Sequence, residues 1–187
     1  LRWRHPERGL LSPLEFIALA EQTRLIIPLG ELVVKKVCAQ IVQWRDAGLP
    51  LQPVSVNVSA LQLKDDRLRR LLRAAIDEQH ISPSLIAIEL TETSILDEEG
   101  SAPEELRLLR AMGIELQIDD FGTGYSSLTY LRHLPVETLK IDQSFVRDML
   151  SDPDDLAIVS GVIGLATAFS RNIVAEGVET VQHAERL

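Results

Sequence analysis

The sequence is poor in the residues that mark a disulfide framework, a zinc site or a membrane span. Its only cysteine, Cys38, lies in a helical pattern and is interpreted as a small buried hydrophobe. The four histidines fall in no zinc-like spacing. The longest mostly apolar stretch, "LAIVSGVIGLATAF", is too short for a bilayer and predicts a buried core helix. A single cysteine allows no disulfide framework, which favours a reducing compartment. We expect a cytoplasmic domain, free or as the cytoplasmic part of a membrane-anchored protein.

Positive charge and aromatic residues are also scarce. Lys and Arg number 19 against 28 Asp and Glu, so the formal net charge is −9, which argues against binding to DNA or RNA polymers and to anionic lipid. An anionic substrate would need metal ions or a few basic groups beside it. Aromatics make up 4%, so the core must consist mainly of Leu, Ile, Val and Ala. The length of 187 residues and 45% hydrophobic content predict one globular domain over residues 1–187.

What the sequence does contain is an alternation of helical and strand patterns from end to end. Strand patterns predict strands at 53–60, 84–92, 114–119, 136–145 and 172–179. Helical spacing and caps predict helices at 12–25, 30–50, 65–80, 102–113, 126–133 and 154–170, and from residue 180 onward. Strands that alternate with helices imply a parallel sheet, because parallel neighbours need crossover connections.

Each predicted strand carries a polar residue near its carboxyl end. These residues are Asn57, Glu89, Asp119, Lys140 and Glu176. If the apolar parity of each strand packs against outer helices, the polar parity points inward and its last members meet at one mouth of a barrel, as in TIM-type folds. Such barrels run to about 250 residues and eight strands. We therefore predict an α/β fold, a modified TIM-type (β/α) barrel that is incomplete at both ends.

The adjacent pair Asp119 and Asp120 becomes intelligible if these strand ends meet. Several carboxylates crowded together ionise only when cations neutralise them. Oxygen ligands select Mg²⁺ or Mn²⁺ over zinc, and a pair of such ions is the clamp of phosphodiester hydrolases. Lys140 could orient a water nucleophile, and no Ser-His or Cys-His pair offers covalent catalysis.

Each of these residues also has a simpler interpretation on its own. Acidic residues at strand ends are commonly helix N-caps, and a single lysine more often forms a surface salt bridge. The "GTGYSS" turn lacks the third glycine of a dinucleotide fingerprint and the lysine of a P-loop, so we interpret it as a turn. Glu92 and Glu179 could be caps, supporting acceptors or ligands. Only their joint recurrence favours function.

The motifs that carry these residues are familiar as a set. "VNVSALQL", "IAIELTET", "IDDFGTGYSSLTYL", "LKIDQSFV" and "VAEGVET", in this order, closely resemble the EAL-domain family of cyclic-di-GMP phosphodiesterases. The opening "LRWRHPERGLLSPLEFIALAE" resembles the segment that follows the Glu-Ala-Leu signature of that family. The resemblance implies a modified TIM barrel that hydrolyses cyclic di-GMP to linear pGpG with two Mg²⁺ or Mn²⁺ ions. It also implies a homodimer, fused in the whole protein to sensory or cyclase domains.

Position by position, the resemblance implies a role for each motif residue. The metal ligands are Asn57, Glu89, Asp119, Asp120 and Glu176, with Asp120 also facing the substrate. Lys140 orients the water, Glu179 is a second glutamate at the site, and Glu92 braces the loop after Asp120. Arg2 contacts a substrate phosphate. The loop 121–127 couples the metal site to a dimer interface.

Two elements of the family pattern fall outside the sequence. The signature glutamate would precede Arg2 by four residues, and the distal Gln-Gly motif would follow Leu187. We therefore expect a piece of a longer, competent domain, and the piece itself can be inactive. The alternative from another class is an inactive EAL-like receptor for cyclic di-GMP or a protein-interaction module. A different metal-dependent barrel enzyme such as a lyase would need a general base that the sequence does not single out.

Overall fold

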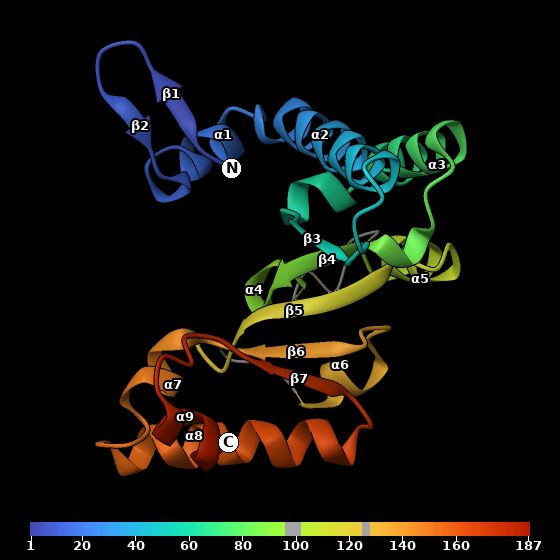
Figure 1. Ribbon diagram of the computed structural model, residues 1–187. Helices are drawn as coiled ribbons and strands as arrows, with labels where there is room; N and C mark the ends of the chain where they lie inside the picture. The colour runs from blue at the N-terminus through green and yellow to red at the C-terminus, as the bar shows by residue number, and fades with distance from the viewer. Residues whose placement is uncertain (96–101, 125–127) are drawn as a thin grey trace.

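A five-stranded parallel sheet organises the molecule. The computed structural model describes residues 1–95, 102–124 and 128–187. Its strands are β3 (Val54–Asn57), β4 (Ile86–Thr91), β5 (Glu115–Phe121), β6 (Thr138–Ile141) and β7 (Asn172–Ala175), paired side by side in that order. All four pairings are parallel. Because the spatial order is the order of the sequence, each new strand joins the same edge of the sheet. An order that never reverses is that of a barrel, because a doubly wound sheet reverses at a switch point. The predicted α/β TIM-type fold is confirmed, and the described strands form an open sector of the barrel (Figure 1).

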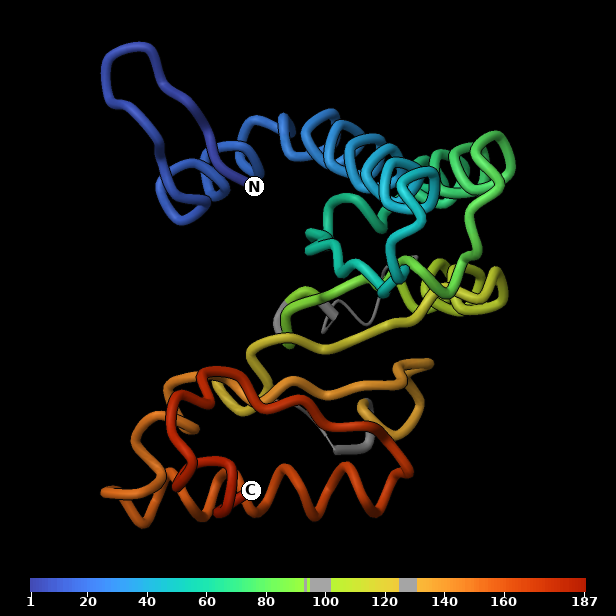
Figure 2. The backbone as a smooth tube through the Cα atoms, viewed as in Figure 1, coloured from blue at the N-terminus to red at the C-terminus, as the bar shows by residue number. Residues whose placement is uncertain are grey.

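Helices and short helical turns connect the strands. Before the sheet come η1 (Pro13–Glu15), α1 (Ile17–Gln22) and α2 (Ile26–Asp46). Between its strands lie η2 (Ala60–Leu63), α3 (Arg67–Gln79), η3 (Pro83–Leu85), α4 (Glu92–Ile95), α5 (Ala102–Ala111), α6 (Leu128–His133), α7 (Gln143–Asp148) and α8 (Pro153–Ala168), and α9 (Val181–Arg186) follows β7. Helices α2 and α3 lie side by side, and α8 runs along β6 and β7 (Figure 2). Among the described residues, no helix is both long and apolar enough to cross a membrane.

The apolar parity of the strands forms the core. Ile88 and Leu90 of β4, Leu116 of β5 and Leu139 of β6 are almost completely buried. They join the same cluster as Leu106 of α5, so these side chains pack beneath the covering helices. Burial of one parity under helices leaves the other parity on the opposite face of the sheet. This is the arrangement that directs the polar strand-end residues toward one mouth.

Four local predictions differ from the structure. The strand predicted over 136–145 ends at Ile141, because Asp142 caps α7 and the chain turns into that helix. A hairpin of β1 (Trp3–His5) and β2 (Gly9–Leu11) precedes the helices and was not expected, because strands of three residues are too short for a periodic pattern. The helix predicted over 12–25 is split into η1 and α1. The next helix begins at Ile26 rather than at residue 30, since Pro28 in its first turn loses no hydrogen bond.

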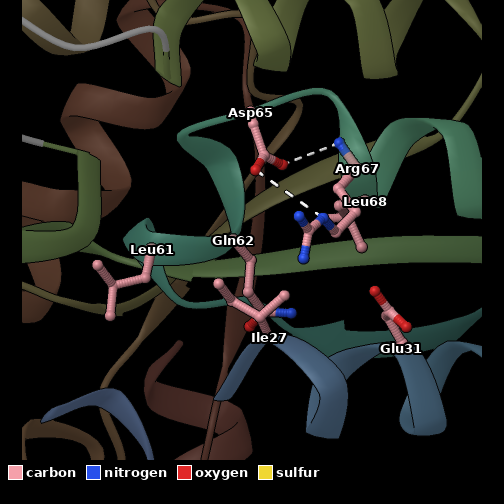
Figure 3. Close-up of a pocket in the computed structure, with 7 residues that line it drawn as sticks. All are labelled: Ile27, Glu31, Leu61, Gln62, Asp65, Arg67 and Leu68. Atoms are coloured by element: carbon pink, nitrogen blue, oxygen red, sulfur yellow. Dashed lines mark hydrogen bonds and ion pairs between the residues drawn. The ribbon is translucent and has the colours of Figure 1, made fainter. Parts of the chain in front are cut away.

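The loop that follows β3 is fixed against α2. Gly30 of α2 lies so close to Gln62 of η2 that a Cβ there would stand 1.9 Å from the Gln62 amide nitrogen. Figure 3 shows Gln62 directed from η2 toward α2 and Ile27. Gln62 is buried and accepts the backbone N–H of Ser59 at 3.1 Å, while the Ser59 hydroxyl donates to Glu21 at 2.6 Å. These contacts hold the chain two residues beyond Asn57, the first of the polar strand ends.

Candidate functional site

The sheet register brings the polar strand ends to one edge. Asn57 of β3 pairs with Glu89 of β4, and Thr91 of β4 pairs with Asp119 of β5. Lys140 is the penultimate residue of β6 and pairs with Val174 of β7. Glu176 directly follows β7. The predicted convergence at the carboxyl ends of the strands is therefore present in the structure.

Lys140 is the centre of this edge. Its ammonium Nζ lies 2.9 Å from Glu89 Oε1, 2.8 Å from Asp119 Oδ1 and 2.6 Å from Glu176 Oε1. Burial alone would lower the pKa of Lys140, but hydrogen bonds to Asp119, Glu176 and Glu89 raise it above its usual value. Lys140 is therefore a permanent cation held by three carboxylates from three strands.

Asn57 fixes the carboxylate of Glu89 from the other side. Its amide Nδ2 donates to Glu89 Oε2 at 3.0 Å, so Glu89 is held between Asn57 and Lys140. Glu89 is 7% exposed, and both of its oxygens have a donor. A carboxylate fixed through both oxygens keeps one orientation, as a ligand of an ion requires.

Asp119 and Asp120 reach the same edge because β5 departs from regular geometry. In a regular strand two consecutive side chains point to opposite faces of the sheet. Asp120 instead has a left-handed backbone with φ of 53°, and the pairing of β5 with β6 shifts register between Ile118 and Phe121. As a result, Asp119, Asp120 and Glu176 each offer a carboxylate oxygen, and these oxygens all lie within 4.8 Å of one another.

Asp120 shares its environment with Asp142, which the sequence interpretation did not include. Burial, the charge of Asp119 and a hydrogen bond with Asp142 raise the pKa of Asp120 to about 6. Burial also acts on Asp142, but hydrogen bonds from the Ser144 hydroxyl and amide, and from Asp120, bring its pKa below the usual value. On acidification the pair therefore takes up its first proton at Asp120. Asp142 is the N-cap of α7, and the "IDQS" sequence indicates the cap but not the contact with Asp120.

This donor set fits a divalent cation. Four carboxylates meet here, those of Glu89, Asp119, Asp120 and Glu176. Within the described part of the chain, Lys140 is the cation that is ion-paired to this group, through three of the four. The excess of negative charge and the oxygen-only ligands suit a hard ion with no sulfur or imidazole preference. An ion at the three clustered oxygens would also relieve the repulsion that raises the pKa of Asp120.

Comparison with known proteins identifies the architecture. The sequence model of the family described as "EAL domain" matches residues 1–187. The chain belongs to the EAL-domain family. The bifunctional diguanylate cyclase/cyclic di-GMP phosphodiesterase MucR of Pseudomonas aeruginosa is 43% identical over 187 residues, which are 100% of this chain and 27% of MucR. The cyclic di-GMP phosphodiesterase PdeR of Escherichia coli is 39% identical over 182 residues, 97% of this chain and 27% of PdeR.

Solved structures agree with this membership. The phosphodiesterase of PaMucR in complex with c-di-GMP superposes with a TM-score of 0.91 at 42% identity, over 100% of this chain and 75% of that one. The EAL enzyme Bd1971, bound to cAMP and cyclic di-GMP, gives 0.89 at 33% identity over 100% of this chain and 51% of the other. This chain spans about a quarter of the length of the curated relatives, which carry further sequence outside the EAL domain.

In this EAL domain, Glu92 holds the turn that follows Asp120. Its Oε2 accepts the backbone N–H groups of Gly122 and Gly124, both at 3.2 Å. Its Oε1 is buried and has no hydrogen-bond partner within the described residues. A Cβ at Gly124 would lie 2.9 Å from the Glu92 carboxyl carbon, so the turn can come this close to Glu92 only with a glycine at position 124. The role of Glu92 in the activity stays a prediction.

Two residues of the EAL pattern lie outside the Lys140 cluster. Arg2 precedes β1 and Glu179 follows β7, and both are exposed. Within the described ranges, no hydrogen bond or ion pair joins either residue to the cluster. Their roles at the substrate phosphate and at the metals stay predictions. Of the loop 121–127, positions 125–127 lie outside the described residues.

Proposed function

We propose that this chain is the catalytic EAL domain of a cyclic-di-GMP phosphodiesterase that cleaves one phosphodiester bond to give linear pGpG. The observation that carries the proposal is the Lys140 cluster, in which carboxylates from β4, β5 and the end of β7 surround one lysine. The relatives MucR and PdeR, named as cyclic di-GMP phosphodiesterases, support the choice of substrate.

The proposal assigns each residue a task. Two Mg²⁺ or Mn²⁺ ions would be held by Asn57, Glu89, Asp119, Asp120 and Glu176. When bound, such ions activate a water nucleophile and stabilise the charge that develops on the phosphate oxygens. Lys140 would orient that water with an N–H released from one of its three carboxylates, which the ions would then neutralise. Glu179 is a further acceptor beside the ions, and Arg2 binds a phosphate of the substrate.

The carboxylates must be ionised for this task. Asp120, with its pKa raised to about 6, carries a proton over part of the mildly acidic range in the absence of metal. Glu92 acts through the backbone, because it fixes the glycine turn that sets the left-handed conformation of Asp120.

We also propose that the domain works as a homodimer in a protein with sensory or cyclase domains.

The test is product analysis by chromatography. The full protein is incubated with cyclic di-GMP and Mg²⁺ or Mn²⁺, and we expect pGpG to accumulate. Asp119→Asn should abolish turnover, while Asp148→Asn, at an exposed ion pair with Arg147, should leave it unchanged. Saturable binding of cyclic di-GMP without hydrolysis would instead favour the receptor alternative. Undiminished turnover by Asp119→Asn would contradict the metal assignment.

A further inference from the structure

A second polar site lies at the opposite pole of the sheet. An open cavity of ≈ 630 Å³ is lined by Arg107, Arg110, Arg132, His133, Leu134 and Arg171, among others. The first two belong to the last turns of α5, and the next two end α6. Arg171 immediately precedes β7. Figure 1 shows that the ends of α5 and α6 lie beside the starts of the strands, away from the carboxyl ends that carry Lys140.

The charge of this cavity is opposite to that of the whole chain. Arg107 is ion-paired with Glu104 at 3.1 Å, and Arg110 with Glu137 at 2.6 Å. Arg132 is exposed and has no ion pair among the residues that the structure describes. Four guanidinium groups are thus opposed by two carboxylates, in a chain whose formal net charge is −9. The local field at this pole favours an anion.

Arg171 is held in place, and part of its donor capacity is unused. One terminal nitrogen donates to the carbonyl of Leu134 at 3.0 Å, and the other donates to the carbonyl of Val136. These bonds fix the segment that leads into β6. Its Nε is buried and has no hydrogen-bond partner in the described part of the chain. A buried N–H without an acceptor is costly, and the positive charge of the guanidinium, which the two carbonyls do not neutralise, remains at the wall of the cavity.

Structural roles account for only part of this set. The two helix ion pairs explain Arg107 and Arg110, and the carbonyl bonds explain the position of Arg171. They leave the charge of Arg132, the exposed imidazole of His133 and the charge of Arg171 without a role. All three residues line one cavity.

We propose that this cavity binds a small molecule that bears two or more linked phosphate groups. Guanidinium groups match phosphate oxygens through paired N–H bonds, and several arginines suit a ligand with several phosphates. The volume lies within the usual range of small-molecule sites, about 300–1,000 Å³. The lining residues that the structure describes include four arginines and no Phe, Tyr or Trp, so the proposal rests on recognition of the phosphates. The site is separate from the Lys140 cluster, and its existence does not depend on the proposed phosphodiesterase activity.

Calorimetric titration with inorganic tripolyphosphate tests the proposal. The protein is used without added metal and at constant ionic strength, so that chelation and screening do not contribute. We expect saturable binding, with a dissociation constant about tenfold or more higher in the double variant Arg107→Gln/Arg132→Gln. Arg147→Gln removes an exposed, ion-paired arginine on α7, outside this cavity, and should bind as the unaltered protein does.

The proposal would be overturned by the absence of saturable heat, by equal affinity of the double variant and the unaltered protein, or by equal affinity for single phosphate and tripolyphosphate. A tighter association with a short polyglutamate peptide would also overturn it, because the cavity would then serve an acidic protein segment. If the double variant unfolds, Arg132→Gln alone decides the matter, since Arg132 is exposed and its replacement breaks no ion pair of the described residues.

Discussion

Lys140 and Asp120 are the two residues on which the chemistry of the site depends most. Lys140 is 8% exposed and balances part of the charge of three carboxylates. Asp120 supplies a further carboxylate. Its ionisation costs free energy in this cluster, because burial and the charge of Asp119 raise its pKa to about 6. Without metal, the carboxylates at this edge are therefore balanced by one ammonium group, and by a proton on Asp120 only at mildly acidic pH.

Removal of the lysine charge should destabilise the metal-free protein. Lys140→Met leaves Glu89, Asp119 and Glu176 without their cation, and loss of one partner of a buried ion pair costs about 3–5 kcal/mol. The measurement is urea unfolding with and without Mg²⁺. We expect the loss to be smaller with Mg²⁺, because the ion replaces part of the missing charge. Lys36→Met, at an exposed position of α2, serves as the control and should change neither value.

Asp120 should make the stability of the metal-free protein depend on pH. Its folded pKa of about 6 lies above the usual value of an aspartate in an unfolded chain, so its contribution to stability is present at low pH and is lost as pH rises through about 6. Asp120→Asn removes this dependence. We expect the variant to gain stability over the unaltered protein, on the order of 1 kcal/mol above pH 6 after allowance for solvent screening, and much less near pH 4.5. Unfolding curves across this pH range give the difference, and a difference that does not vary with pH would contradict the account.

At the scale of the element, the turn after β5 decides where Asp120 points. The register shift and the left-handed Asp120 need the two backbone N–H groups of the turn to be held, and Glu92 accepts both. The approach of Glu92 leaves no room for a side chain at Gly124. Strand, turn and short helix therefore act together to place one carboxylate.

Gly124→Ala should disrupt this placement. The added methyl group would stand 2.9 Å from the Glu92 carboxyl and force the turn or the glutamate to move. We expect stability to fall by about 1–3 kcal/mol, with one buried acceptor left unpaired, and turnover of cyclic di-GMP to fall about tenfold or more. Steady-state kinetics and urea unfolding measure the two effects. Unchanged kinetics would show that Glu92 and the turn do not position Asp120.

Gly161→Ala is the matched glycine substitution in open space. Gly161 lies in the interior of α8, and a Cβ there meets nothing within 4 Å. Alanine is favoured over glycine in a helix interior, so we expect a gain of roughly 0.5–1 kcal/mol in unfolding free energy and no change in turnover. A loss of stability would mean that α8 needs this glycine for a contact that the described residues do not include.

The sequence was sufficient for the long elements and insufficient for the local irregularities. Alternation of apolar residues predicted β4 and β5 because their buried parity is uninterrupted over 86–91 and 114–118. The same alternation would place Asp119 and Asp120 on opposite faces, and only the bulge and the positive φ of Asp120 bring them together. Asp142 was missed because an N-cap aspartate has the same pattern whether or not it contacts a second carboxyl group.

At the scale of the whole molecule, opposite charges gather at opposite ends of the sheet. Carboxylates of three strand ends surround Lys140, and the arginines of the cavity lie where β6 and β7 begin. A strand order that never reverses is what brings all carboxyl ends to one side. Since a cation can bind the acidic end only in the folded state, divalent metal should stabilise the entire domain.

Thermal unfolding should therefore depend on metal concentration. A ligand that binds only the folded state at one hundred times its dissociation constant adds about 2.7 kcal/mol. We expect Mg²⁺ or Mn²⁺ to raise the unfolding midpoint and a chelator to reverse the change. Asp119→Asn should weaken the response, whereas Asp148→Asn, outside the cluster, should retain it.

The most direct test of the account is a titration with Mn²⁺ followed by electron paramagnetic resonance of the free ion. The account predicts saturable binding of two ions by the unaltered protein, marked weakening in Asp119→Asn, and weaker binding below pH 6, where Asp120 is protonated. No saturable binding, or equal binding by the Asp119→Asn variant, would contradict the claim that the carboxyl ends of these strands form a cation site.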